Sequence, residues 1–389
     1  VFINLQKIIM MNFTWNIPTR LHFGKDCVQK LGSIINDYAS NVLIVTGSNS
    51  SKQNGSLDDV INQLKLSNIK YHILDKVKSN PRVEEVREGI AIAKKENIDT
   101  IIAIGGGSAI DSAKAIAAGY YYDGDVWDFY EYIVKPTNAL PIVAVNTLAA
   151  TGSEMNGTSV LQNQEKEVKT AIGSILLFPK DTFCDPTYTI SVPLNYTIYG
   201  MADIIAHLWE AFFGMGDATL SDRFGKAIFD EIMEYGPLLL NDLTNYEYRE
   251  KIMYASTCAL NGLTIMGKKT GDWGVHDIGH HLSLLYDVPH GASLSVVYPA
   301  WLNWLKNKSA YGITKFGLTY FDNDDPDIII LKAIESLKAI QAPIKLKDLN
   351  IPNLNKEYFL QLLTKNKATG AFYQLDEADL KWIVDELFK

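Results

Sequence analysis

Residues 101–114 read IIAIGGGSAIDSAK, and they indicate a buried strand that runs through a glycine turn into a helix. The apolar, β-branched run at 100–104 is typical of a strand covered on both faces. Glycines let a backbone approach a ligand closely, and the N–H groups that open a helix suit a phosphate. The GxGxxG spacing is absent and an ordinary tight turn has the same composition, so the prediction of phosphate binding rests on the position of the turn at a strand end.

Strand and helix patterns alternate on both sides of this stretch. Apolar runs predict further strands, and helical spacing predicts helices between them. Such alternation indicates a parallel sheet with helices on both faces. An alternating segment near the N-terminus reads as an edge strand that can pair with a second subunit. The predicted strands span 19–23, 42–45, 71–74, 100–104 and 141–145, and the predicted helices span 57–64, 83–95 and 108–118.

The pattern changes near Pro193, after which helical periodicity dominates, from 199 to 239, from 246 to 266 and again near the C-terminus. We therefore expect an α/β domain over residues 11–190, built on a parallel sheet, and an all-α domain over 191–389. We also expect the native start at Met11 or Met10, with the residues before it an upstream extension.

Composition excludes several classes of protein. The 389 residues carry a formal net charge of -9 and no basic run, which argues against nucleic-acid binding. No apolar run approaches the length that a bilayer requires. Three scattered cysteines and no CxxC pair argue against a disulfide framework and a zinc–cysteine site. We expect a cytoplasmic protein with no nucleic-acid or membrane partner.

A second polar turn follows the strand at 141–145. Residues 146–154 read NTLAATGSE, and hydroxyl groups at a strand end can bind a cofactor. They can equally cap the next helix. The two turns together make a stronger prediction of a cofactor site than either does alone.

Four of the seven histidines in the chain fall within GDWGVHDIGHHLSLLYDVPHG, residues 271–291. His276 and His280 are four residues apart, as are Asp203 and His207, so each pair shares one face of a helix. A carboxylate and several imidazoles from separate segments predict a site for iron, zinc or nickel, which would act as a Lewis acid. Packing explains any one of these histidines taken alone.

Five histidines and an aspartate overfill most metal sites. His280 shares a helix face with His276. His281, as the next residue, points a quarter turn or more away from His280 around the helix. We therefore expect His281 to point outward and to bind nothing. His290 follows a proline and opens another apolar segment, from which it can supply a ligand.

These residues resemble the iron-dependent, group III alcohol dehydrogenases, and within them the bacterial butanol dehydrogenase branch. The motifs keep their order from the N-terminal strand to residue 291, and as a set they are highly specific. They are IPTRLHFG (17–24), IGGGSAIDSAK (104–114), YYDGDVWD (121–128), ATGSEM (150–155), CDPTYT (184–189), GMADIIAH (200–207) and HDIGHHLSLLYDVPHG (276–291). The resemblance implies a Rossmann-like N-terminal domain, a helical C-terminal domain and a cleft between them.

The resemblance also assigns roles to residues. The metal ligands of the family fall on Asp203, His207, His276 and His290, and its additional active-site histidine falls on His280, a candidate proton relay. The implied cofactor contacts are Gly47, Ser48, Asn49, Ser50, Gly105, Gly106, Gly107, Ser108, Asp111, Thr147, Thr151, Ser153 and Lys169.

The implied activity is hydride transfer between NADP(H) and short-chain primary alcohols or aldehydes, such as butanol and butanal, with Fe²⁺ or Zn²⁺. NAD-preferring branches often carry aspartate where this chain has Gly47. Residues 47–50 offer no carboxylate and Lys52 is near, so we expect NADP(H) to be preferred over NAD(H). The expected assembly is a homodimer formed through the edge strand.

Two alternatives remain open at this point. A lyase similar to dehydroquinate synthase would use bound nicotinamide transiently and would need cationic groups, of which Lys268 and Lys269 are the main candidates. A metal-binding protein without activity would retain the nucleotide turn as a relic. Trp209, Phe212 and Trp273 either line an apolar substrate pocket or pack between helices.

Overall fold

The computed structural model describes residues 9–47 and 49–389, and contacts between Cα atoms divide the chain into two compact units. The sheet unit comprises Ile17–Gly200 and Leu238–Thr257. The helical unit comprises residues 9–16, Met201–Pro237 and Cys258–Lys389. The division falls inside three helices, and the predicted domain boundary at residues 190 and 191 stays a prediction.

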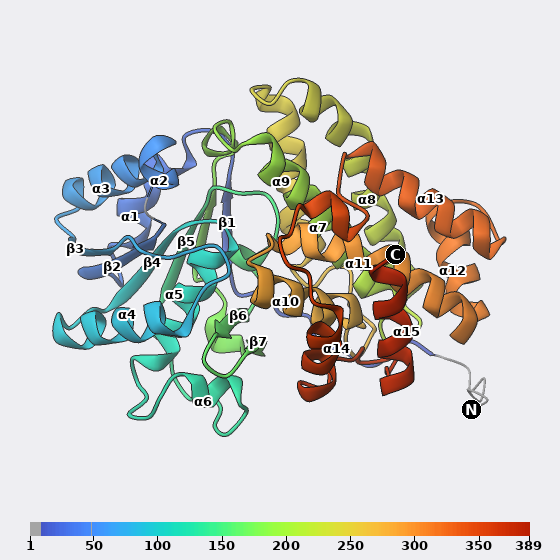
Figure 1. Ribbon diagram of the computed structural model, residues 1–389. Coiled ribbons are helices and arrows are strands. Elements are labelled where there is room, and N and C mark those ends of the chain that lie inside the picture. Colours follow the sequence, from blue (N-terminus) through green and yellow to red (C-terminus); the bar gives the residue numbers. More distant parts are fainter. Residues whose placement is uncertain (1–8, 48) are drawn as a thin grey trace. The chain divides into compact units, whose positions relative to one another are not determined.

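The sheet unit contains six parallel strands in the order β1-β8-β5-β4-β2-β3, together with a separate antiparallel hairpin, β6-β7 (Figure 1). The strands are β1 (Arg20–Phe23), β2 (Asn41–Thr46), β3 (Lys70–Leu74), β4 (Thr100–Gly105), β5 (Ile142–Asn146), β6 (Thr158–Asn163), β7 (Val168–Gly173) and β8 (Asp181–Cys184). The predicted parallel sheet and its edge strand are confirmed, whereas β6, β7 and β8 were not predicted.

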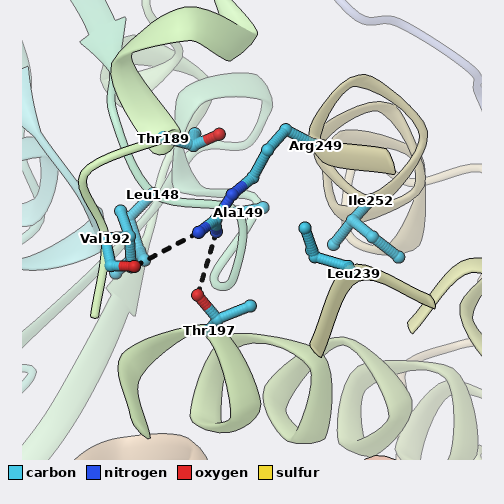
Figure 2. Close-up of a pocket in the computed structure, with 8 residues that line it drawn as sticks. All are labelled: Leu148, Ala149, Thr189, Val192, Thr197, Leu239, Arg249 and Ile252. Carbon is cyan, nitrogen blue, oxygen red and sulfur yellow. Dashed lines mark hydrogen bonds between the residues drawn. The ribbon is translucent and has the colours of Figure 1, made fainter. Parts of the chain in front are cut away.

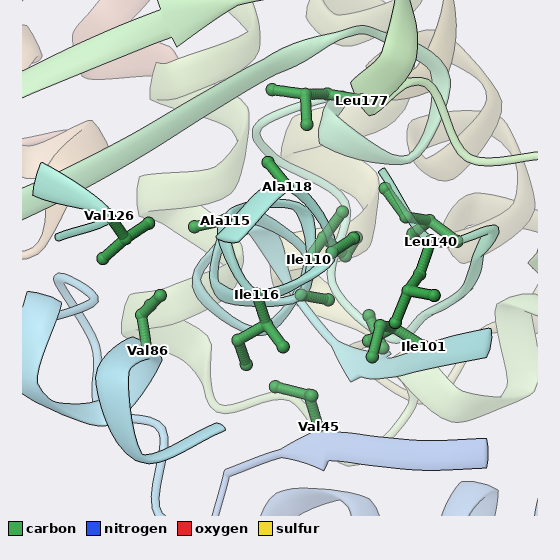
Figure 3. Close-up of a cluster of buried hydrophobic side chains, with 14 of the residues drawn as sticks. Val45, Val86, Ile101, Ile110, Ala115, Ile116, Ala118, Val126, Leu140 and Leu177 are labelled. Atoms are coloured by element: carbon green, nitrogen blue, oxygen red, sulfur yellow. The ribbon is translucent and has the colours of Figure 1, made fainter. Parts of the chain in front are cut away.

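Helices cover both faces of this sheet, as expected from its apolar strands. Alternate residues of β2 point to opposite faces, so that Val45 packs with α4 and α5 while Ile44 packs with α1 and α3. Figure 1 shows the helices on the two faces of the sheet, and Figure 3 shows buried side chains on one of these faces, with Ile116 of α5 among them. The helices of the unit are α1 (Leu31–Ile35), α2 (Ser50–Gln53), α3 (Ser56–Leu66), α4 (Val83–Lys95), α5 (Gly107–Gly119) and α6 (Trp127–Tyr130), with short 3-10 turns η1 (Cys27–Lys30), η2 (Ser153–Met155), η3 (Ile175–Leu177) and η4 (Pro186–Thr189).

The rest of the chain is helical, and no strand occurs among residues 185–389, all of which the structure describes. The helices are α7 (Leu194–Phe212), α8 (Thr219–Asn241), α9 (Tyr246–Ala259), α10 (Gly274–Tyr286), α11 (His290–Lys308), α12 (Ala310–Tyr320), α13 (Pro326–Ala339), α14 (Lys356–Lys365) and α15 (Glu377–Leu387), with the 3-10 turn η5 (Leu346–Leu349). The predicted class, a Rossmann-like α/β region followed by an all-α region, is confirmed. Within the described residues, no helix combines the length and the apolar character that crossing a membrane requires.

Two predicted helices are shorter than their sequence patterns suggested. The periodic segment 199–239 is interrupted between α7 and α8, where Gly216 has a φ of 127° that a helix cannot contain. The segment 246–266 ends as a helix at Ala259, before Gly262 with a φ of 98°. Apolar spacing continues through both breaks, so periodicity alone did not locate them.

Candidate functional site

The proposed metal ligands lie on three helices of the helical unit. Asp203 and His207 are one turn apart on α7, His276 lies on α10, and His290 is the first residue of α11. Ligand-capable atoms of Asp203, His276 and His290 all lie within 4.8 Å of one another. Segments that are separated by up to 87 residues of sequence therefore converge on one point, as a metal site requires.

Two distances test whether one ion fits among these groups. The Asp203 Oδ1 atom lies 3.5 Å from His207 Nε2 and 3.6 Å from His290 Nε2. Ligand atoms placed about 2.1 Å from one ion at tetrahedral angles lie about 3.4 Å apart. The separations match that spacing, and the mixture of one carboxylate with imidazoles suits iron or zinc.

Burial favours the neutral imidazoles that bind metals. Asp203, His207 and His276 are 2, 3 and 7 % exposed. Burial, and then the neighbouring His276, lower the pKa of His207 well below its usual value, so this ring is neutral at neutral pH. The rings of His207 and His276 stack with centroids 5.0 Å apart.

His280 lies beside this group. Its ring centroid is 5.3 Å from that of His290 and 6.3 Å from that of His276. His281 does not point outward as expected, because it is 2 % exposed. Its Nδ1 atom lies 2.7 Å from the Asp277 carbonyl oxygen and its Nε2 atom lies 3.0 Å from the Asn366 amide. Those contacts leave His281 a role in packing.

Only one of the three candidate pocket aromatics lies near the histidines. The ring centroid of Trp273 lies 5.3 Å from that of His276 and 6.5 Å from that of His207. Trp209 and Phe212 pack instead among aromatic rings such as Phe316, and both are buried. For these two the packing interpretation holds.

The predicted cofactor turns lie at the carboxyl edge of the sheet. β2 and β4 are neighbours, and the chain leaves β2 toward β3 on one side before it returns to β4 on the other. This reversal is the switch point at which open α/β sheets bind ligands. Gly47 follows β2. Gly105 ends β4, Gly106 joins it to α5, and Gly107 and Ser108 begin that helix.

The two turns are connected by hydrogen bonds and by close contact. The Thr147 N–H donates to the Gly105 carbonyl (3.1 Å), and the Ser153 hydroxyl donates to Asp111 (2.6 Å). A Cβ atom at Gly107 would lie only 2.4 Å from the Thr151 Cγ2 atom, so glycine is required there. The structure thus brings the first and second turns together.

A buried lysine that we did not single out, Lys114, completes this connection. Its ammonium donates to the carbonyl and the hydroxyl of Ser153 (both 2.7 Å), to Asn156 Oδ1 (3.1 Å) and to the Thr158 carbonyl (2.7 Å). Burial lowers the pKa of Lys114 to about 8, against the opposing effect of the nearby Asp111. The sequence feature that could have pointed to Lys114 is its position three residues after Asp111, on the same face of α5.

The remaining predicted cofactor residues lie outside the hydrogen-bonded network that joins the two turns. Lys169 on β7 donates to Asn80 Oδ1 (2.8 Å). Asn49 precedes α2 and Ser50 begins it, whereas Ser48 lies outside the described residues. Lys52 forms an exposed ion pair with Asp75 (3.3 Å), which follows β3 and places a carboxylate near this turn.

A small pocket, shown in Figure 2, has Leu148 and Ala149 of the second turn among its lining residues. Arg249 on α9 donates to the Thr197 hydroxyl (2.9 Å) and the Val192 carbonyl (3.2 Å). Burial lowers the pKa of Arg249 to about 10. None of the predicted site residues lines this pocket.

Comparison with known proteins identifies the family of the chain. A family model described as iron-containing alcohol dehydrogenase matches residues 18–186, and the model for the C-terminal part of that family matches residues 197–387. The chain belongs to the iron-containing alcohol dehydrogenase family. The predicted enzyme class is thereby confirmed.

Individual relatives support the butanol dehydrogenase branch. The chain is 40% identical over 380 residues to a probable NADH-dependent butanol dehydrogenase 1 of Bacillus subtilis, covering 95% of this chain and 98% of that protein. It is 33% identical over 298 residues to the NADPH-dependent aldehyde reductase YqhD of Escherichia coli, covering 76% of each. The crystal structure of an NADH-dependent butanol dehydrogenase A from Thermotoga maritima matches with a TM-score of 0.93 and 34% identity, covering 98% of this chain and 100% of that one.

The contact between Gly107 and Thr151 gives a test of the turn geometry. We expect Gly107→Ala to displace the second turn and to raise the KM for the nicotinamide cofactor about tenfold or more, because small misplacements of binding groups cost large factors. Steady-state kinetics with varied cofactor measure this. The matched control is Gly173→Ala, where a Cβ meets nothing within 4 Å; an equal effect of both changes would contradict the interpretation.

Proposed function

We propose that this member of the iron-containing alcohol dehydrogenase family interconverts short-chain primary alcohols and aldehydes, such as butanol and butanal, with NADP(H) and a bound divalent metal. The observation that carries the proposal is the convergence of Asp203, His276 and His290 within 4.8 Å. His207, with its Nε2 atom 3.5 Å from Asp203, would be the fourth ligand. The names of the relatives support the substrate class.

The proposed roles of the residues follow from their placement. When bound, Fe²⁺ or Zn²⁺ supplies a Lewis acid for the substrate oxygen, and the nicotinamide supplies or accepts the hydride. Asp203 brings a negative charge that offsets part of the charge of the ion, and the buried rings exclude water from it. Gly47, Asn49, Ser50, Gly105, Gly106, Gly107, Ser108, Asp111, Thr147, Thr151, Ser153 and Lys169 are the proposed cofactor residues, with Ser48 as a further candidate.

His280 is the proposed proton relay. It lies next to His276 and His290, is 8 % exposed, and can carry a proton toward solvent. The lyase alternative loses support, because the ammonium of Lys268 is buried against Asp222 and the Ala211 and Phe212 carbonyls. A group held in this way caps α7 and has no bonding capacity left for an acidic substrate.

We also propose a cytoplasmic homodimer. Among the residues that the structure describes, β1 ends the sheet and borders only β8, and the proposed dimer would form along its other edge. No disulfide joins Cys27, Cys184 and Cys258, all of which the structure describes, and this agrees with the proposed reducing compartment. The light-scattering mass of the full chain would test the dimer.

Metal dependence is tested with protein stripped of metal under anaerobic conditions. We expect butanal reduction to be lost and to return with Fe²⁺ or Zn²⁺ added separately. Asp203→Asn should lower kcat/KM at least about a hundredfold, because charge stabilisation by such a metal contributes several kcal/mol. Full activity of stripped protein would contradict the proposal. Metal binding without any change in reduced-cofactor absorbance would instead favour the inactive metal-binding protein.

Cofactor preference is tested by turnover with NADPH and NADH at equal concentration. The turn at 47–50 has no carboxylate among its residues, so we expect NADPH to be the better substrate. Gly47→Asp should shift the ratio about tenfold toward NADH through repulsion of the 2′-phosphate. A Cβ there would lie 3.3 Å from the Val77 carbonyl oxygen, so the change requires only a small adjustment. A clear preference of the unmodified enzyme for NADH would refute this expectation, and Asp75, the ion-pair partner of Lys52, would then be the carboxylate to examine.

The relay is tested by the pH–rate profile. His280→Ala should lower kcat about a hundredfold and change the dependence of kcat on pH, with metal content intact. His72→Ala on β3, which removes a partly exposed imidazole from the sheet unit, is the control and should change neither. An unchanged profile in His280→Ala would rule out the relay.

A further inference from the structure

Glu210 is a buried carboxylate on the face of α7 that carries two of the proposed metal ligands. It lies on α7, three residues after His207 and seven after Asp203, so these three side chains share one face of the helix. Its carboxylate is only 1 % exposed. A carboxylate buried to this degree requires several hydrogen-bond donors. The hydrogen-bond partners of the Glu210 carboxylate are groups of Trp273 and His276, at the start of α10.

The first contact of Glu210 is with the backbone at the start of α10. This helix begins after Trp273, which adopts a left-handed conformation (φ 65°) and provides no side-chain cap. Glu210 supplies the cap from another helix, since Oε2 accepts the Trp273 N–H (2.7 Å) and Oε1 accepts the His276 N–H (2.9 Å). Two N–H groups that a helix start leaves unpaired are thereby satisfied.

The second contact is with the imidazole of His276. The Nδ1 atom of this ring lies 3.2 Å from Glu210 Oε1. An oxygen that already accepts a backbone N–H serves as an acceptor here too, so the ring proton belongs on Nδ1 and the lone pair on Nε2. Histidines that bind metals usually donate their second ring N–H to a carboxylate or carbonyl, and loss of that partner typically weakens metal binding 10- to 100-fold.

We propose that Glu210 is a positioning residue for the metal site. One face of α7 would present Asp203 and His207 as ligands, while Glu210 fixes the backbone, the tautomer and the ring orientation of His276 on α10. The inference rests on the proposed metal site. It extends that site by a residue that holds a ligand without being one.

The test compares two buried carboxylates at the start of α10. Glu210→Gln keeps the shape but turns one acceptor oxygen into an N–H₂ donor, which opposes one of the three N–H groups. The matched control is Asp272→Asn, because Asp272 also accepts an N–H at this helix start, from Gly274 (3.2 Å). The Asp272 carboxylate also accepts hydrogen bonds from the backbone N–H groups of Phe372 and Tyr373, and none of these bonds involves a histidine.

The readouts are the Zn²⁺ dissociation constant, from competition with a chelator, and the visible absorption spectrum of the Co²⁺-loaded full chain. We expect Glu210→Gln to weaken Zn²⁺ binding 10- to 100-fold and to alter the Co²⁺ spectrum. Asp272→Asn should lower the Tm but leave the dissociation constant within about threefold. Equal effects of the two changes on metal affinity, or no effect of Glu210→Gln, would overturn the inference.

Two further measurements keep the outcome interpretable. Glu210→Asp retains the carboxylate and should recover part of the lost affinity if Glu210→Gln proves poorly folded. No recovery in a folded Glu210→Asp would count against the inference. If the unmodified chain binds less than one Zn²⁺ and lacks metal-dependent activity, the proposed function fails and this inference fails with it. Normal binding by the unmodified chain, unaffected by either Glu210 change, overturns the inference alone.

Discussion

The carboxyl ends of all six strands meet at one edge of the sheet because every strand runs parallel. The turns that follow β2, β4 and β5 are therefore neighbours, although they are spread over 100 residues of sequence. The strand order reverses between β2 and β4, which opens the edge there. The placement of a glycine turn beside a hydroxyl-rich turn depends on this arrangement more than on either motif alone.

Burial of charge gives these turns their rigidity. Burying an ammonium such as that of Lys114 without hydrogen-bond partners would cost a prohibitive amount of free energy. Here four oxygen atoms accept hydrogen bonds from it. Three of those atoms belong to Ser153 and Asn156, so the same bonds hold the second turn in one conformation. The helical unit uses a comparable device, in which one enclosed carboxylate, Glu210, holds the start of α10. In both cases the cost of desolvation selects a single geometry.

Much of the architecture was predictable, because apolar runs identify β2, β4 and β5 and helical spacing identifies α4 to the residue. β8 was missed since its inward polar residue, Asp181, is stabilised by Arg20, His22 and Tyr38, which lie more than 140 residues earlier. Such a strand lacks the apolar pattern of its neighbours. Its identification requires knowledge of tertiary contacts that local sequence does not carry.

The histidine cluster shows the same limit at the level of single side chains. Helical spacing grouped His276 with His280 and separated His281. The structure confirms this, because His280 lies beside His276 and His290 whereas His281 contacts the Asp277 carbonyl and Asn366. The prediction that His281 faces outward was wrong because Asn366, 85 residues later, covers it. Glu210 was equally visible in the sequence, three residues after His207, but its partners at 273 and 276 are known only from the fold.

The position of β1 next to β8 has a consequence during synthesis. Arg20–Phe23 pairs along its length with Asp181–Cys184, so β1 leaves the ribosome about 160 residues before its partner strand. At about 5 to 20 residues per second this interval lasts roughly 8 to 32 seconds. Throughout that time the nascent chain exposes an unpaired strand, while β2, β3, β4 and β5 can already associate. β1 therefore joins the sheet late, and until then its unpaired backbone is open to capture by a chaperone or by another nascent copy.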